Sequence, residues 1–336
     1  MLYSLSRMAG AKGEEIMKKY PLKLSYISKS AIWGGNTLRD SWGKLSQGEN
    51  IAETWELSVR EREMATVKNG EAAGMTLDTY FKAAGYDSVS KTFKEGDRFP
   101  LLVKFIDAAS PLSVQVHPDD SFAKEIENDS GKTEMWYVLD AREGATLIYG
   151  LRDGVTSEDY ACAVAENNIE GAMNYVKVKA GDCFFIPAGM VHAIGEGILI
   201  AEIQQNSDLT YRVYDYNRVG ADGKMRELHT EKALKVVRPF TEDEVNALRY
   251  SEGYESDILV NNEYFKVKQI NVEEFSDIEA TEQSFISLLC IDGDGAIAYD
   301  KEEFPIVRGD SYFLPAGMGL ATLKGNMKLI CSQIQG

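Results

Sequence analysis

The stretch that decides the fold is GDCFFIPAGMVHAI at residues 181–194, because a second version, GDSYFLPAGMGLAT, occupies residues 309–322. Both begin with Gly-Asp, continue through a short aromatic and aliphatic run, and reach Pro-Ala-Gly-Met. A Gly-Asp turn, a strand and a Pro-x-Gly turn are typical of a β unit. The match over ten positions indicates an internal duplication, although the first version carries His192 where the second carries Leu320.

Composition limits the classes of function. The chain has 336 residues, 44% of them hydrophobic and 26% charged, which is ordinary for a globular protein with one large or two average domains. A net charge of -17 argues against nucleic acid or an anionic membrane as partner. An anionic ligand would therefore need a local cluster of cations.

The sequence shows no export or membrane signal. No apolar run approaches the roughly 20 residues of a membrane helix, and the N-terminus lacks the apolar core of a signal peptide. The four cysteines, which have no C-x-x-C spacing, are expected to be small buried thiols rather than a disulfide framework. We expect a cytoplasmic protein in which residues 1–18 are a tail without structural pattern.

Strand-like segments dominate the chain. Residues 20–115 contain short apolar runs with Gly and Pro between them, and the run from about 257 to the end shows strands without a convincing helix. Five segments have helical spacing and capping residues, at 75–86, 119–132, 156–168, 230–240 and 241–250. The chain is thus expected to divide near 240–255 into a β unit with helical insertions and a smaller, purer β unit.

Two strand-like segments place metal-binding side chains together. In SVQVHPDD, alternation puts Gln115 and His117 on one face and two valines on the other. In GKTEMWYVL, the carboxylate of Glu134 shares a face with Lys132, and a buried carboxylate needs a cation, either that lysine or a metal. Together with His192, the side chains of Gln115, His117 and Glu134 offer two nitrogens and two oxygens, a set that suits Zn²⁺ or a similar ion. The ordinary structural interpretation stays open, because a lone histidine or a single Q-x-H is a weak signal.

These motifs resemble the cupin superfamily. GDCFFIPAGMVH fits the second cupin motif, G-x5-P-x-G-x2-H, and Gln115, His117 and Glu134 are similar to the first. Within the cupins, LSVQVHPDD, GKTEMWYVL, FIPAGMVHAI and TYRVYDYNR together look like type I mannose-6-phosphate isomerase, in its short bacterial form. WGGNTLRDSWGK and ETWELS fit too, so that the resemblance runs from about residue 19 to the end.

The resemblance implies a fold and its division. We expect a mainly β protein of two cupin-type jelly-roll β-barrels or sandwiches with short helical insertions in the N-terminal half. Residues 19–250 would be the catalytic, metal-binding unit and residues 251–336 a smaller cupin-like unit without metal. In the second unit the turn would persist because the fold needs it, and Leu320 would be a core side chain.

The resemblance also implies site residues. One Zn²⁺ per chain would be held by Gln115, His117, Glu134 and His192, and the catalytic residues would be Arg212 and Lys132. Members of the family commonly have proline between that lysine and glutamate, where this chain has a threonine at position 133.

The implied reaction is the reversible isomerisation of mannose 6-phosphate and fructose 6-phosphate through an enediol(ate). A Lewis acid stabilises the developing oxyanion, and ring opening needs acid–base help. Arg212 would hold the enediolate or the phosphate, unless it is an ordinary surface partner of Asp215. Lys132 would bind phosphate or hydroxyls or transfer a proton, and Ser113 is a weaker candidate for phosphate contact. Tryptophans 33, 55 and 136 line the sugar site or, as is usual in β sandwiches, belong to the core.

Two other functions fit parts of the pattern. A redox cupin such as a dioxygenase would more usually offer three histidines, whereas only two of the three histidines here lie in cupin motifs. A non-enzymatic sugar-binding cupin would leave Lys132 and Arg212 without a task. A small sugar phosphate is the expected partner, and the protein is expected to be a monomer or a homodimer.

Overall fold

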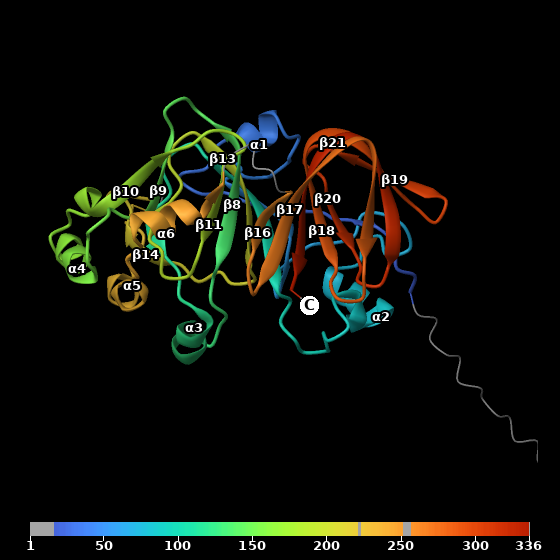
Figure 1. Cartoon of the computed structure of the whole chain (residues 1–336), viewed down its shortest axis with the longest axis horizontal. Coiled ribbons are helices and arrows are strands. Elements are labelled where there is room, and N and C mark those ends of the chain that lie inside the picture. Colours follow the sequence, from blue (N-terminus) through green and yellow to red (C-terminus); the bar gives the residue numbers. More distant parts are fainter. Residues whose placement is uncertain (1–16, 221–222, 251–256, 336) are drawn as a thin grey trace, which may run out of the picture.

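The computed structural model describes residues 17–220, 223–250 and 257–335. It consists of two β units that lie side by side, the first drawn mainly in blue to yellow and the second mainly in orange and red (Figure 1). The predicted mainly β class, with short helices in the N-terminal part, is confirmed. Among the described helices, none is long and apolar enough to cross a membrane.

The first unit is a sandwich of two antiparallel sheets. One sheet has the order β10 (Met173–Lys177), β9 (Thr146–Leu151), β12 (His192–Ala193), β7 (Val114–Val116) and β14 (Tyr211–Tyr214). The other has the order β15 (Arg249–Tyr250), β11 (Cys183–Ile186), β8 (Glu134–Ala141), β13 (Ile198–Gln205), β6 (Leu101–Ala108), β3 (Glu53–Leu57) and β2 (Ile27–Lys29). A separate hairpin pairs β4 (Val59–Arg60) with β5 (Glu63–Met64).

The second unit is built on one sheet. Its order is β1 (Leu22–Lys23), β20 (Ser311–Leu314), β18 (Ile286–Tyr299), β21 (Gly319–Ile334), β17 (Phe265–Ala280) and β16 (Ile258–Asn261), and β19 (Glu302–Val307) pairs with β18. The edge strand β1 comes from the start of the chain. The sheet of the second unit therefore contains a strand from the N-terminal part of the chain as well as strands from residues 258–334. The division of the chain at residue 250 stays a prediction.

All five predicted helices are present. They are α2 (Leu77–Ala84), α3 (Asp120–Glu127), α4 (Ser157–Ala165), α5 (Thr230–Val236) and α6 (Glu242–Ala247). Capping explains three starts: Asp119 accepts the Phe122 amide, and Thr156 and Thr241 form capping boxes. The sequence missed α1 (Thr37–Asp40) and the 3₁₀ turns Tyr86–Ser88 and Glu170–Ala172, which are single turns too short for a periodic pattern. As predicted, the described residues 257–335 contain no helix.

The duplicated stretch forms the same structure twice. Gly181 and Gly309 have φ of 90° and 91°, a region that favours glycine, and the strands after them, β11 and β20, start and end at matching positions. The backbone hydrogen bonds of the turn also correspond. In the first unit the Gly181 amide donates to the Val138 carbonyl at 2.9 Å, and the Val138 amide donates to the Asp182 carbonyl at 2.8 Å. In the second unit the Gly309 amide donates to the Cys290 carbonyl at 2.8 Å, and the Cys290 amide donates to the Asp310 carbonyl at 3.0 Å. These bonds make Val138 and Cys290 equivalent positions.

The equivalence shows what the second unit lacks. Glu134 pairs with Ile186 in the first unit, and Ile286 pairs with Leu314 in the second, so an isoleucine stands where the first unit has its carboxylate. The prediction for Leu320 is wrong, because this side chain is 61% exposed. Leu320 is the second residue of the long strand β21 and its side chain faces solvent, while the core beneath is filled by other side chains.

One hydrophobic core joins the two units. The N-terminal rings Phe81 and Phe99 pack on Phe313 and Phe285 of the second unit, with ring centroids 5.6 and 5.2 Å apart. Most of the predicted tail lies outside the described residues; Lys18 pairs with Asp300 at 2.5 Å. The four cysteines are free thiols, and all but Cys162 are buried.

Candidate metal centre and catalytic site

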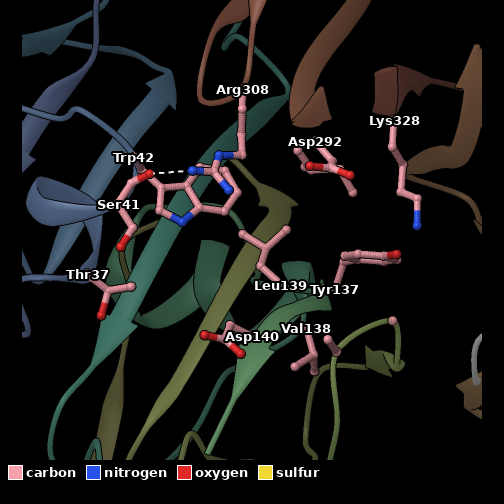
Figure 2. Close-up of a pocket in the computed structure, with 13 residues that line it drawn as sticks. Thr37, Ser41, Trp42, Tyr137, Val138, Leu139, Asp140, Asp292, Arg308 and Lys328 are labelled. Atoms are coloured by element: carbon pink, nitrogen blue, oxygen red, sulfur yellow. Dashed lines mark hydrogen bonds between the residues drawn. The ribbon is translucent and has the colours of Figure 1, made fainter. Parts of the chain in front are cut away.

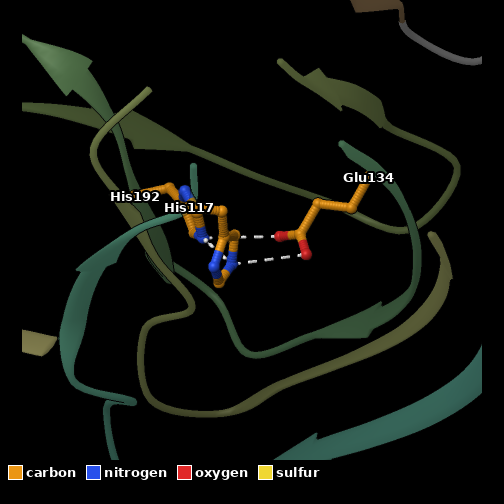
Figure 3. A group of neighbouring side chains, drawn as sticks. All are labelled: His117, Glu134 and His192. Atoms are coloured by element: carbon orange, nitrogen blue, oxygen red, sulfur yellow. Dashed lines mark hydrogen bonds and ion pairs between the residues drawn. The ribbon is translucent and has the colours of Figure 1, made fainter. Parts of the chain in front are cut away.

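Three buried side chains meet between the two sheets of the first unit. The metal-binding atoms of His117, Glu134 and His192 all lie within 4.8 Å of one another (Figure 3). His192 Nε2 is 3.2 Å from His117 Nε2 and 3.4 Å from Glu134 Oε1, while His117 Nε2 is 3.6 Å from Glu134 Oε2. The structure thus brings together three of the four predicted ligands from distant parts of the sequence.

Local structure fixes the direction of each ligand. His117 follows β7, whose valines 114 and 116 are buried in a hydrophobic cluster on the opposite face, as alternation predicted. Nδ1 of His192 lies 2.8 Å from the Met190 carbonyl, which accepts only, so this nitrogen carries the hydrogen and Nε2 keeps its lone pair for a metal. Glu134 starts β8, on the facing sheet.

The fourth predicted ligand, Gln115, lies in the same row. In the sheet register Gln115 stands directly opposite His192 on β12 and opposite Arg212 on β14. Side chains at directly opposite positions point to the same face with their Cβ atoms about 5 Å apart. Gln115 is half-buried and borders the cluster on the side that leads to Arg212.

The chemistry of the donor set fits a divalent cation. Both carboxylate oxygens of Glu134 are buried, and the polar atoms beside them among the described residues include the two imidazole Nε2 atoms and Lys132 Nζ. Burial raises the pKa of Glu134 to about 7 and lowers the pKa of His192 to about 4, and burial also holds the pKa of His117 well below its usual value. Neutral imidazoles and an ionised carboxylate are the donors that a metal ion needs.

Lys132 lies beside the cluster. Its Nζ is 3.0 Å from Glu134 Oε2, and the side chain is almost completely buried. The sequence left open whether Lys132 or a metal compensates the carboxylate. The geometry allows both, because Lys132 contacts one oxygen while Oε1 faces His192.

A second buried ion pair, which was not predicted from the sequence, lies next to Lys132. Lys104 on β6 and Glu202 on β13 are cross-strand partners with Nζ and Oε1 3.1 Å apart, and Trp136 Nε1 donates to the other oxygen at 3.0 Å. Burial opposes ionisation of Glu202, but the Lys104 and Lys132 ammonium groups lower its pKa to about 2. Each residue is a charge within a mostly apolar run of its strand, LLVKFI for Lys104 and ILIAEI for Glu202, a signal that could have identified the pair.

Arg212 is half-buried on β14 at the other end of the row. Its Nε donates to Ser113 Oγ at 3.2 Å and its Nη1 to the Glu227 carbonyl at 2.8 Å. The alternative of an Arg212–Asp215 surface pair is not realised, because Asp215 instead binds Arg218 and Arg226, each through a contact of 2.5 Å.

The arginines create a local excess of positive charge in an acidic protein. Burial lowers the pKa of Arg212, and the nearby Arg226 and Arg218 lower it further. Two guanidinium groups bind the buried carboxylate of Asp215, and Arg212 adds a third positive charge nearby. This is the cluster of cations that an anionic ligand of a chain with charge -17 requires.

The tryptophans and the third histidine have other surroundings. Trp136 packs edge-on against His192 with ring centroids 5.3 Å apart, while Trp55 lies under Lys104 and Trp33 belongs to the core. All three tryptophans are buried, as is usual in β sandwiches. His229 lies outside the cluster and accepts the Arg212 backbone amide at its Nδ1.

Comparisons with known proteins agree with this architecture. Residues 22–149 match the family model of the type I phosphomannose isomerase catalytic domain, and residues 255–334 match that of the mannose-6-phosphate isomerase cupin domain. Mannose-6-phosphate isomerase ManA of Bacillus subtilis is 36% identical over 321 residues, covering 95% of this chain and 100% of the relative. The enzyme of Streptococcus mutans is 35% identical over 313 residues, covering 93% and 98%. The crystal structure of the mannose 6-phosphate isomerase from Bacillus subtilis superimposes with a TM-score of 0.82 at 35% identity, covering 93% of this chain and 99% of that chain.

Proposed function

The chain belongs to the type I mannose-6-phosphate isomerase family, which interconverts mannose 6-phosphate and fructose 6-phosphate, and we propose that the cluster of His117, Glu134 and His192 is its catalytic centre. The observation that carries this proposal is the meeting of three buried donor side chains, one directly after β7 and the others from β8 and β12. Lys132 and an arginine cluster adjoin them, which places a metal-binding set beside groups able to bind an anion.

The family is metal-dependent, and we propose one Zn²⁺ per chain, held by Gln115, His117, Glu134 and His192. With one anionic ligand only, the bound dication keeps net positive charge and acts as a Lewis acid towards substrate oxygen. Nitrogen and oxygen donors in these numbers suit zinc.

We propose Lys132 as the catalytic residue closest to the metal. The reaction removes a proton from C2 of the open-chain aldose and returns one to C1 by way of an enediolate. As an ammonium group 3.0 Å from Glu134, Lys132 can donate to the substrate oxygen on which negative charge develops. Release of its proton there would make the same nitrogen a base for the next transfer.

We propose that Arg212 holds the phosphorylated end of the substrate. Its guanidinium is fixed by Ser113 and the Glu227 carbonyl, and the excess positive charge of Arg218 and Arg226 extends from it. Arginine binds phosphate through paired donors. The row from His192 through Gln115 to Arg212 spans two strand spacings, or about 10 Å, a distance that a hexose phosphate can bridge.

The other functions considered have less support. A redox cupin with three histidine ligands is disfavoured, since His229 lies apart from the cluster beside the Arg212 backbone. An idle sugar-binding cupin is disfavoured by the placement of Lys132 against Glu134. We further propose a cytoplasmic location, consistent with four free thiols, and a monomer or homodimer, which light scattering can decide.

A coupled assay tests the proposal. Chelator-treated protein is assayed for conversion of mannose 6-phosphate to fructose 6-phosphate, with and without added Zn²⁺, Mn²⁺ or Fe²⁺. Activity that returns best with one equivalent of zinc is the expected result. Full activity in metal-free protein would contradict the catalytic centre, and preferential recovery with another ion would contradict zinc.

A further inference from the structure

A pocket lined by residues of both β units lies between them. Its volume is about 400 Å³, within the usual range of small-ligand sites, which often occupy such interfaces. Figure 2 shows its walls: Trp42 and Thr37 on one side, Tyr137 to Asp140 from β8, and Asp292, Arg308 and Lys328 from the second unit. None of the proposed metal ligands lines it.

The duplicated fold builds this pocket from both copies. β8 pairs Val138 with Ile200 and Asp140 with Leu199 on β13, so Leu139 bulges out of the register. At the equivalent place β18 pairs Cys290 with Leu329 and Asp292 with Lys328 on β21, so Ile291 bulges out. A bulge re-aims side chains and often adjoins a functional site. Both bulged residues line the pocket, as does the turn before β11 and that before β20.

The metal-free unit supplies the cations of the pocket. Arg308 precedes Gly309 as Ala180 precedes Gly181, so Arg308 occupies the position of Ala180 in the first unit. Lys328 pairs with Asp292 as Leu199 pairs with Asp140, so Lys328 occupies the position of Leu199. The unit that lacks the metal ligands therefore carries two basic side chains at positions that are apolar in its counterpart.

Arg308 is held in place without a carboxylate partner among the described residues. Its Nη2 donates to the Ser41 carbonyl at 2.6 Å, and its guanidinium carbon is 5.1 Å from the centre of the Trp42 ring (Figure 2). A guanidinium fixed by stacking and one carbonyl keeps further donors for an anion.

The remaining walls define the rest of the ligand. The carboxylates of Asp140 and Asp292 and the hydroxyls of Thr37 and Ser41 are partners for sugar hydroxyl groups. The Trp42 ring already contacts Phe105, with ring centroids 4.9 Å apart, and the Arg308 guanidinium, so the sugar hydroxyls rather than a nucleobase are the better match to these walls. We propose that this pocket between the units is a binding site for a hexose phosphate, separate from the catalytic site, with the phosphate on Arg308 and hydroxyls on Asp140.

The test needs a probe that the catalytic site neither converts nor retains. Glucose 1-phosphate is a suitable probe, because its phosphorylated anomeric carbon prevents ring opening to the carbonyl form. The probe is added to the full-length Arg212→Gln variant, which lacks the proposed catalytic phosphate contact. Calorimetry on this variant should show one binding site, and adding Arg308→Gln should weaken binding by about tenfold or more, as expected for a charged hydrogen bond. Adding Asp140→Asn should weaken binding of glucose 1-phosphate while leaving that of inorganic phosphate unchanged.

Three results would overturn the proposal: no binding to Arg212→Gln protein up to about 10 mM, a range that reaches beyond millimolar affinity; equal binding after Arg308→Gln; or inorganic phosphate binding as tightly as the sugar phosphate. Unfolding curves check that each variant is folded. The single variant Arg308→Gln should keep its isomerase activity, since neither the proposed metal ligands nor Lys132 and Arg212 line this pocket.

Discussion

Replacing His192 by leucine copies the second unit into the first and tests the catalytic centre directly. His192 is fully buried, with Nδ1 bonded to Met190 and Nε2 facing Glu134. Leucine has a similar volume but no donor atom. We expect His192→Leu to fold, to lose its metal and to lose activity, and the structure allows each effect to be given a size.

The stability of the metal-free protein should change little. The variant loses one hydrogen bond, worth about 1 kcal/mol, and gains apolar contact of about 1–2 kcal/mol with the surrounding core. For 336 residues, an unfolding entropy of about 2 cal/mol/K per residue converts 1 kcal/mol into roughly 1.5 °C. The melting temperatures of metal-free wild type and variant should therefore agree within about 2 °C.

The effect of zinc on the melting temperature should differ strongly between the wild type and the His192→Leu variant. At a zinc concentration 100 times the dissociation constant, binding stabilises the wild type by about 2.7 kcal/mol, or roughly 4 °C. The variant should show no such increase. Loss of Lewis-acid stabilisation worth about 4 kcal/mol lowers kcat about a thousandfold.

Leu320→His is the matched control. It restores the histidine of the motif in the second unit, but Ile286 stands there in place of Glu134 and the side chain at 320 is exposed. This control should gain no second metal and keep normal activity. If His192→Leu keeps a metal-dependent rise in melting temperature, or activity within tenfold of wild type, the assignment of His192 as a ligand is refuted.

Three further predictions concern the same site. Lys132→Met should keep one bound metal but lower kcat about a hundredfold or more, as for loss of a proton-transfer group, and unchanged kcat would exclude its proposed role. Arg212→Lys should raise KM for mannose 6-phosphate about tenfold with a smaller change in kcat, because lysine lacks the paired donors; steady-state kinetics decide this, and an unchanged KM contradicts phosphate binding. Since burial raises the pKa of Glu134 to about 7 and metal needs the ionised carboxylate, zinc affinity should fall about tenfold per pH unit below 7 and level off above it; a flat profile from pH 5.5 to 8 counts against this.

The sequence predicted the elements with strong local signals. Helices with a capping residue and periodic apolar positions, such as α3 and α4, were found because capping and periodicity are encoded within a few residues. Alternation placed valines 114 and 116 in the core and left Gln115 and His117 on the other face. The meeting of His117, Glu134 and His192 was expected from the resemblance to cupins, because their separation along the chain carries no distance information.

What the sequence did not reveal depends on contacts between distant segments. The Lys104–Glu202 pair forms because β6 and β13 are neighbours, and neither strand shows its partner locally. Leu320 was misplaced because its apolar character was taken as burial, whereas the register of β21 turns it to solvent. The partners of Asp215 likewise come from a loop, since Arg226 lies eleven positions further along the chain.

The place of β1 has a consequence for how the chain folds during synthesis. Lys23 of this strand bonds to Asp310, 287 residues later, and Lys18 bonds to Asp300. Leu22 pairs with Phe313, so the first described strand must wait for nearly the whole chain to leave the ribosome. Contacts at such separations fold slowly. Although Leu24 could still pair with Val67, a nascent chain stopped before residue 300 would leave β1 without its strand partner β20, which makes the second unit the last part of the protein to become protease-resistant.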